Sequence, residues 1–164
     1  MNNNIEFIIY TIGVYAKTED DFFNALTDNR IRILVDVRNR RGMRGAKYKF
    51  VNSIYLQKKL DELGIAYLHA KAFSPNAELR DIQKAQDKQD KTLKSQRKVM
   101  APAFVEEYKR SVLANQSIED LMTEIKTITG EEDPRLCLFC VEASAEACHR
   151  SIIAEAIGVE VCDL

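Results

Sequence analysis

Residues with reactive side chains gather near the C-terminus, in the stretch LCLFCVEASAEACHRSIIAEAI from Leu136 to Ile157. Thiolates are nucleophiles, carboxylates and imidazoles transfer protons, and guanidinium groups bind anions. Within fourteen residues this stretch combines all four side-chain types, at Cys137, Cys140, Glu142, Cys148, His149 and Arg150. The sequence therefore predicts a functional site here, although it does not name the reaction.

The local pattern predicts where this cluster lies in the fold. Leu136 to Val141 is apolar on both faces, which is typical of a central strand in a parallel sheet covered by helices on both sides. A short loop from Glu142 to Ser144 follows, and then a helix that runs to about Ile157. Because such sheets bind ligands beyond the carboxyl ends of their strands, the cluster lies in the favoured place.

Cys148 has two interpretations. With Ser144 as an N-cap, Cys148 ends the first helical turn, where the helix dipole lowers the pKa of a thiol. The same helix start offers backbone N–H groups to an anion, with Arg150 as a clamp. Against this, Cys148, Ile152 and Ala156 are spaced four apart, and free cysteine is often simply packed in a core.

Cys137 and Cys140 form a C-x-x-C pattern, which is typical of zinc and redox sites. In a strand, however, residues three apart point to opposite faces. Zinc also needs four ligands, and only Cys148, His149 and distant His69 remain to complete the set. We therefore predict no metal and leave the cofactor open. A metal held by Cys140, Cys148 and His149 is an alternative, whereas redox sensing has only the proximity of the thiols in its favour.

A second constellation, DVRNRRGMRGAKYK, runs from Asp36 to Lys49 and follows another predicted strand. After Asp36 it contains no acid but six cationic residues, which are Arg38, Arg40, Arg41, Arg44, Lys47 and Lys49. The functional interpretation is a phosphate or nucleic-acid contact, with Tyr48 or Phe50 available for stacking. The alternative is a solvated basic loop in which Asp36 and Arg38 pair with each other.

The remaining pattern alternates strands and helices, which indicates βαβ units and a parallel sheet. Glu78 to Lys98 is strongly polar and is interpreted as a loosely packed helix or helix pair, or as a partly mobile insertion. Other strands are expected over Ile5–Ile12, Ile31–Val37, Ile65–His69 and Val159–Cys162, and helices from Thr18 to Asn29, from Asn52 or Ser53 to Gly64, from Pro102, and from Ser117 to Thr129.

Bulk composition narrows the class of protein. A chain of 164 residues with 46% apolar and 30% charged residues is expected to form one globular domain, residues 1–164, with a polar helical insertion around residues 78–98. No signal peptide, membrane span or lipidation motif is apparent, so we expect a cytoplasmic protein with reduced thiols and no membrane partner. The net charge of −1 argues against nucleic acid bound over the whole surface, but not against a local phosphate site.

Together these motifs resemble the DUF488 family, prokaryotic proteins of unknown function. The resemblance rests on TIG at Thr11, DVR at Asp36, RGMRG from Arg41 to Gly45, FVNS from Phe50 to Ser53, LGIxY up to Tyr67, SPNAELRD from Ser74 to Asp81, the Phe104–Tyr108 pair and the terminal C-x-E…CHR. It implies an α/β fold, a Rossmann-like three-layer sandwich with a mostly parallel central sheet and helices on both faces. The signature positions that it implies are Asp36, Arg38, Arg44, Cys140, Glu142, Cys148, His149 and Arg150.

The leading hypothesis is an enzyme that acts on a phosphate-bearing substrate, a nucleotide or a nucleic acid, although catalysis itself stays open. Cys140 or Cys148 would supply the thiolate, and Glu142, His149 or Asp36 would transfer protons. The substrate-binding residues would be Arg38, Arg44, Arg150 and Thr11. The C-x5-R spacing of cysteine phosphatases, the P-loop and the dinucleotide fingerprint are all missing. The alternative is a non-catalytic nucleic-acid-binding or interaction module that uses the basic loop, residues 38–49.

Overall fold

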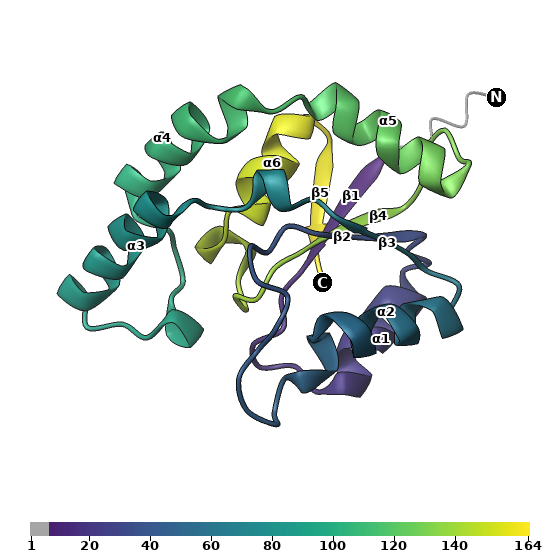
Figure 1. The fold of residues 1–164 in the computed structure, drawn as a ribbon, viewed down its shortest axis with the longest axis horizontal. Coiled ribbons are helices and arrows are strands. Elements are labelled where there is room, and N and C mark those ends of the chain that lie inside the picture. Colours follow the sequence, from purple (N-terminus) through teal and green to yellow (C-terminus); the bar gives the residue numbers. More distant parts are fainter. Residues whose placement is uncertain (1–6) are drawn as a thin grey trace.

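The computed structural model describes residues 7–164, which form a five-stranded sheet in the order β3-β2-β4-β1-β5 (Figure 1). Every pair of neighbouring strands is parallel, which confirms the predicted α/β fold with a parallel sheet. Residues 1–6, which include the start of the first predicted strand at Ile5, lie outside the described residues. The strands are β1 (Ile8–Ile12), β2 (Ile33–Asp36), β3 (Ala66–His69), β4 (Leu136–Phe139) and β5 (Glu160–Asp163).

Helices cover both faces of the sheet, with α1 and α2 on one face and α5 and α6 on the other, while α3 and α4 lie together to one side (Figure 1). This arrangement follows from right-handed crossovers, because the chain moves along the sheet from β1 to β3 and then returns through β4 to β5. The helices are α1 (Glu19–Asp28), α2 (Ser53–Glu62), α3 (Ala77–Gln89), α4 (Pro102–Ser111), α5 (Ile118–Thr129) and α6 (Arg150–Ile157).

Local capping signals fix most helix starts. Thr18 and Asp21 form a capping box before α1, in which each side chain accepts a hydrogen bond of 3.1 Å from the other residue's backbone N–H. Pro102 opens α4, and the Ser117 side chain caps α5. Among the described residues the longest helix, α3, has only 13 residues, and no helix is long and apolar enough to cross a membrane.

The start of the last helix differs from the sequence prediction. Ser144 precedes only a short 3₁₀ turn, Ala145–Ala147, and the backbone of Cys148 is then extended, with φ −137° and ψ 144°. Regular helix begins at Arg150, so Cys148 is not in the first turn of a helix that Ser144 caps. The extended residue turns the chain so that the neighbouring His149 ring reaches the backbone at the end of β2, where it bonds the carbonyl of Val37.

The strand order brings three loops together at the carboxyl edge of the sheet. Strand β4 lies between β2 and β1, so the loop that follows it rises between the loops that follow the other two. Backbone hydrogen bonds join them, since the amides of Val14 and Tyr15 both donate to the Val141 carbonyl at 3.0 Å, and the Val37 amide donates to the Phe139 carbonyl at 3.1 Å. Each loop carries part of the candidate site.

Gly13 allows the first and third of these loops to touch. A Cβ atom at this position would lie 1.8 Å from the carbonyl oxygen of Glu142. Backbone on both sides cannot move without displacing the site, so we expect Gly13→Ala to reduce the free energy of unfolding by at least about 2 kcal/mol. Urea denaturation measures this, with Gly42→Ala as the control because a Cβ there would meet its nearest neighbour at 4.0 Å. Equal midpoints for the two variants would contradict the proposed close contact.

Candidate functional site

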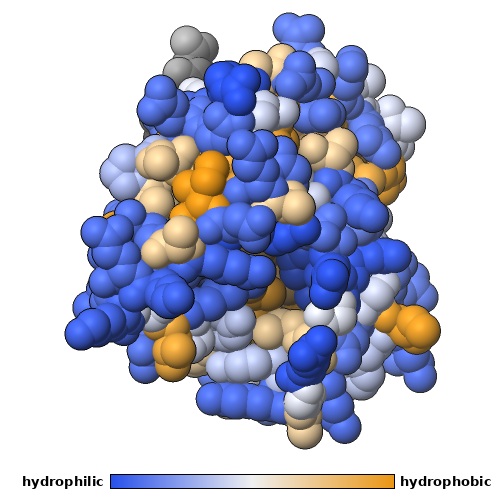
Figure 2. Space-filling model, turned by 60° about the vertical axis from the view of Figure 1, so that its left-hand side comes forward, coloured by the Kyte–Doolittle hydropathy of each residue, from blue (hydrophilic) through white to orange (hydrophobic). Residues whose placement is uncertain are grey.

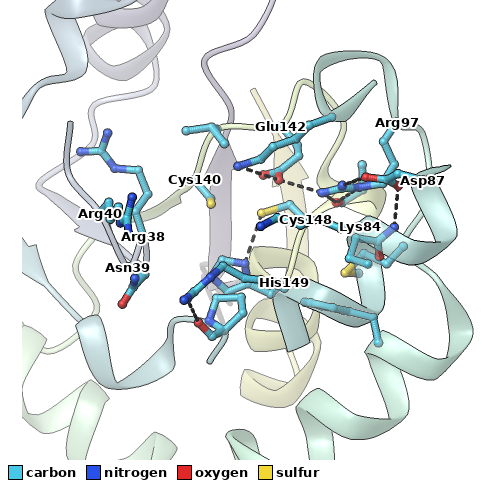
Figure 3. A pocket seen from close by; sticks show the side chains of 18 of the residues that line it. Arg38, Asn39, Arg40, Lys84, Asp87, Arg97, Cys140, Glu142, Cys148 and His149 are labelled. Atoms are coloured by element: carbon cyan, nitrogen blue, oxygen red, sulfur yellow. Dashed lines mark hydrogen bonds and ion pairs between the residues drawn. The ribbon is translucent and has the colours of Figure 1, made fainter. Parts of the chain in front are cut away.

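A cavity of about 630 Å³ opens at the carboxyl edge of the sheet. Cys140 and Cys148 lie at its base, with Glu142 and His149 on either side of the two sulfurs (Figure 3). The basic loop after β2 forms one wall, where Figure 3 shows Arg38 and Arg40. Helix α3 and the segment between α3 and α4 form the opposite wall. Six of the predicted site residues therefore line this cavity, namely Arg38, Arg44, Cys140, Glu142, Cys148 and His149.

Cys148 and His149 form a close thiol–imidazole pair. The Cys148 sulfur lies 3.5 Å from Nδ1 of His149, while Nε2 of the same ring lies 2.9 Å from the carbonyl oxygen of Val37. A carbonyl only accepts, so Nε2 must carry a proton, and Nδ1 is left to exchange one with the thiol. This arrangement orients the imidazole in the way that thiol nucleophiles require.

The electrostatics of this pair favour a thiolate. Burial raises the pKa of the Cys148 thiol, but hydrogen bonding with Cys140 and the charge of His149 outweigh burial and hold that pKa well below its usual value. For His149, burial lowers the pKa, but the negative charge of Cys148 outweighs it and raises that pKa above its ordinary value. Cys140 stays a thiol, because its hydrogen bond with Cys148 and its burial raise its pKa.

Glu142 lies beside the two sulfurs and is 5% exposed. Burial, followed by the negative charge of Cys148, raises the pKa of its carboxyl group to about 7. Its Oε1 atom pairs with Nη2 of Arg97 at 2.8 Å, whereas its Oε2 atom is buried without a hydrogen-bond partner in the described residues. A carboxyl group with this pKa can both give and accept a proton near neutral pH.

Arg97 is a site residue that sequence reasoning missed. Its guanidinium bridges Glu142, Asp87 at 2.7 Å and the carbonyl oxygen of Ala147 at 3.2 Å. It comes from the polar segment, which the sequence showed only as a run of lysine and glutamine without an apolar face. The segment packs through a few residues, since Leu79 is fully buried and the side chain of Gln83 accepts a hydrogen bond of 2.9 Å from the backbone of Ala101. No regular spacing marks Arg97 in the sequence.

Asp36 is bound by neighbouring side chains of the protein and does not line the cavity. Its carboxylate accepts hydrogen bonds from Nε and Nη2 of Arg38 at 2.9 and 2.7 Å, and from the Tyr67 hydroxyl at 2.7 Å. Burial and the nearby Asp36 raise the pKa of Tyr67 to about 12, so this hydroxyl keeps its proton. Asp36 therefore has no contact with the cavity through which the predicted proton transfer would act. Arg38 reaches it, and its Nη1 atom is buried with no partner among the described residues.

Arg150 and Thr11 also lie behind the site rather than in it. The Arg150 side chain is fully buried, and its Nη1 atom donates to the Glu142 carbonyl at 2.8 Å while Nη2 pairs with Asp163 at 3.3 Å. The Thr11 hydroxyl donates to the same Asp163 carboxylate at 2.6 Å. Neither residue lines the cavity, so the structure gives no contact through which the predicted substrate-binding roles would act. Both are occupied in joining β1, β5 and the loop after β4.

The walls of the cavity are strongly basic. Arg44, predicted as a substrate-binding residue, belongs to them. The surface on the side of α3 and α4 is mostly hydrophilic (Figure 2). Three acidic residues line the cavity, Asp81, Asp87 and Glu142, against seven cationic residues, Arg38, Arg40, Arg44, Arg80, Lys84, Lys94 and Arg97. A concave surface with this charge excess attracts anions, although the whole chain carries a net charge of only −1.

The same cluster contains the donor atoms for a metal ion. The sulfurs of Cys140 and Cys148 and a ring nitrogen of His149 lie within 4.8 Å of one another, and zinc accepts such ligands. Cys137 does not belong to this group, and all four cysteines are free thiols. Strand β4 ends at Phe139, so Cys137 lies within the strand while Cys140 follows its end, and only Cys140 lines the cavity.

These features define a parallel α/β protein with a thiol–imidazole pair in a basic cavity at the carboxyl edge of its sheet. The model of the DUF488 family, described as a domain of unknown function, matches residues 18–157. The chain therefore belongs to the DUF488 family, which confirms the resemblance seen in its motifs. No curated protein and no solved structure matches the chain significantly.

The raised pKa of Glu142 predicts how stability depends on pH. Between the ordinary value of 4.5 and the folded value of about 7, the folded state holds a proton that the unfolded state releases. The contribution of Glu142 to the free energy of unfolding is therefore fully present below pH 4.5. It decreases by on the order of 3 kcal/mol as the pH rises from 4.5 to 7. Glu142→Gln cannot titrate, so its free energy of unfolding should fall less over this range than that of the wild type.

Urea denaturation at several pH values between 4.5 and 7.5 measures the two slopes, and the exposed Glu146→Gln serves as the control. The control should keep the wild-type slope. Parallel curves for the wild type and Glu142→Gln would show that the carboxyl group is ionised normally in the folded protein.

Proposed function

We propose that this protein is an enzyme in which the Cys148 thiolate attacks an anionic, phosphate-bearing substrate. The observation that carries the proposal is the thiol–imidazole pair, 3.5 Å between sulfur and Nδ1, at the base of a cavity with an excess of cationic walls. A cysteine that only packs in a core stays a neutral thiol and needs no imidazole beside its sulfur, whereas a reactive thiolate does. The Cys148 side chain is 2% exposed, and the cavity is its access to ligands.

Each cluster residue has a role in this proposal. The sulfur of Cys148 forms a bond to the electrophilic atom of the substrate, and the leaving group takes the proton of Glu142. Water then attacks the covalent intermediate, Glu142 accepts the proton of that water, and the thiolate is released. His149 stabilises the thiolate through Nδ1, and Cys140 donates its S–H to the same sulfur. Arg97 pairs with Glu142 and positions its carboxyl group.

The phosphate of the substrate is a binding handle in this scheme rather than the reacting group. The chain lacks the C-x5-R loop in which cysteine phosphatases enclose the phosphate that they attack, since Arg150 follows Cys148 by two positions and is fully buried. Arg38 presents a buried Nη1 atom without a partner in the described residues, and Arg40 and Arg44 lie on the same wall. Guanidinium groups in such a position bind phosphate oxygens.

Alkylation tests the state of the sulfur. In a Cys162→Ser background, which removes the exposed thiol, we expect iodoacetamide at pH 6.5 to modify Cys148 at least about tenfold faster than a free thiol such as glutathione. His149→Asn should remove most of this advantage, because the stabilising imidazole is lost. Peptide mass spectrometry locates the modified residue, and Cys137→Ser is the control because Cys137 is fully buried elsewhere.

Two results would contradict the proposal. One is a Cys148 that reacts no faster than glutathione at pH 6.5 in protein with a normal circular dichroism spectrum. The other is one equivalent of zinc in the purified protein by elemental analysis, with alkylation only after a chelator is added. The second result would identify Cys140, Cys148 and His149 as a metal centre.

Protection against alkylation tests the anion. A nucleoside monophosphate should slow modification of Cys148, and Arg40→Glu with Arg44→Glu should raise the half-protective concentration about tenfold or more, because two cationic groups become anionic. Lys109→Glu on the outer side of α4 makes a charge change of the same kind away from the cavity and should leave protection unchanged. Protection that is equal in all three proteins would remove the basic wall from the binding site.

A further inference from the structure

We infer that the substrate is single-stranded nucleic acid, whose backbone continues from the candidate site into a second basic groove. This inference rests on the proposed function for the site and adds the class of substrate. The second groove has a volume of about 730 Å³ and lies between the starts of α1 and α2 and the end of the basic loop. Nothing in the proposed chemistry requires this groove.

The lining of the groove is rich in lysine. Four of its lining residues are cationic, Lys17, Lys47, Lys49 and Lys58, and only Glu19 is acidic. The Glu19 carboxylate accepts a hydrogen bond from the Tyr55 hydroxyl, so it is already engaged. Four cations against one occupied acid form a local site for phosphate groups in a protein of nearly zero net charge.

The two hollows are formed by the same two chain segments. Tyr15 lines the cavity, and Lys17, two residues further on, lines the groove. In the basic loop, Arg44 lines the cavity while Ala46 and Lys47 line the groove. Cationic groups therefore follow the loop from one hollow to the other without an intervening acid, as a continuous phosphate backbone requires.

Two aromatic rings lie on the two segments that line both hollows, Tyr15 beside Lys17 and Tyr48 between Lys47 and Lys49. The rings of Tyr15 and Tyr48 lie edge to face with centroids 5.5 Å apart, and the Tyr48 hydroxyl accepts a hydrogen bond of 3.2 Å from the backbone N–H of Ala16. Both tyrosines are only partly buried. Basic grooves interrupted by aromatic rings are the common means by which proteins hold single strands, since bases stack on the rings while cations contact phosphates.

The start of α2 adds to the positive potential of the groove. Asn52 stands at the N-cap position, but its side chain accepts a hydrogen bond of 2.6 Å from the backbone N–H of Met43 instead of capping the helix. The positive end of the helix dipole therefore faces the lysines without a side-chain cap. The exposed Ile54 belongs to the same lining, and it offers an apolar surface to a base.

The depth of the reactive sulfur selects a single strand over a duplex. Cys148 is 2% exposed at the base of the cavity, so a reacting nucleotide must enter it individually. Bases in a duplex are stacked and paired, and extracting one costs a few kcal/mol. An unpaired strand meets no such cost and can place one nucleotide in the cavity while its neighbours cross Tyr15 and Tyr48.

Fluorescence anisotropy with labelled oligodeoxythymidylates tests the inference. We expect the ten-nucleotide strand to bind at least tenfold more tightly than the dinucleotide, because only the longer strand reaches the groove, with an affinity that falls steeply with salt. Lys47→Glu combined with Lys58→Glu should weaken binding of the ten-nucleotide strand about tenfold or more and leave the dinucleotide unchanged. Lys109→Glu, which reverses one charge away from both hollows, is the control for a change of surface charge. Tyr48→Leu should weaken the longer strand more than Tyr48→Phe, which keeps the ring.

Three outcomes overturn the inference: equal affinity for the two lengths, a double lysine variant that binds like Lys109→Glu, or heparin that binds as tightly as the ten-nucleotide strand. If a nucleoside monophosphate still protects Cys148 from alkylation in these experiments, the proposed function stands and only the extended substrate is lost. If no phosphate compound protects the thiol, the proposed function fails as well.

Discussion

The cost of burying a negative charge at Cys148, whose thiol has a pKa held well below its usual value, is the constraint on which the rest of the site depends. Taking a thiolate out of water is costly unless donors replace the lost solvent. His149 supplies one such donor at 3.5 Å, and the Cys140 thiol supplies another. Burial, followed by this same charge, raises the pKa of the Glu142 carboxyl group to about 7. The protonation states of these four groups are therefore one coupled system, and changing any one of them alters the others.

The fold provides that system with a rigid base. Arg150 bonds the Glu142 carbonyl from behind, Gly13 lets the first loop touch the same carbonyl, and the His149 ring is fixed on the Val37 carbonyl. Arg38 is held by Asp36 at two atoms and covers the Phe139 ring at 4.5 Å, while its Nη1 atom is buried without a partner among the described residues. These polar contacts to backbone and carboxylate groups fix the orientation of the side chains around the cavity.

Sequence patterns predicted the parallel sheet and the grouping of residues at its carboxyl edge, because both follow from the spacing of residues that are close in the sequence. Apolar runs at β2 and β4 and the capping residue Thr18 identify parallel strands and helices, and strand ends place Cys140 and Arg38 at one edge. The patterns could not show that Asp36 and Arg150 lie behind the site, because a charged residue at a strand end or a helix start has the same local pattern whether it contacts ligand or backbone. They also placed Cys148 in a helix, since the extended residue before α6 depends on the contact of His149 with distant Val37.

Arg97 shows why the polar segment could not be interpreted locally. Its ion pairs with Asp87 and Glu142 connect residues 10 and 45 positions apart, and both carboxylates are largely buried. Breaking either pair leaves a buried charge without compensation, so these ion pairs, together with the buried Leu79, fix α3 and the segment after it against the body of the protein. The same guanidinium pairs with the carboxylate of Glu142, whose pKa is raised. Order in this segment and the acidity of Glu142 are therefore linked, and an anion that competes for Arg97 would affect both.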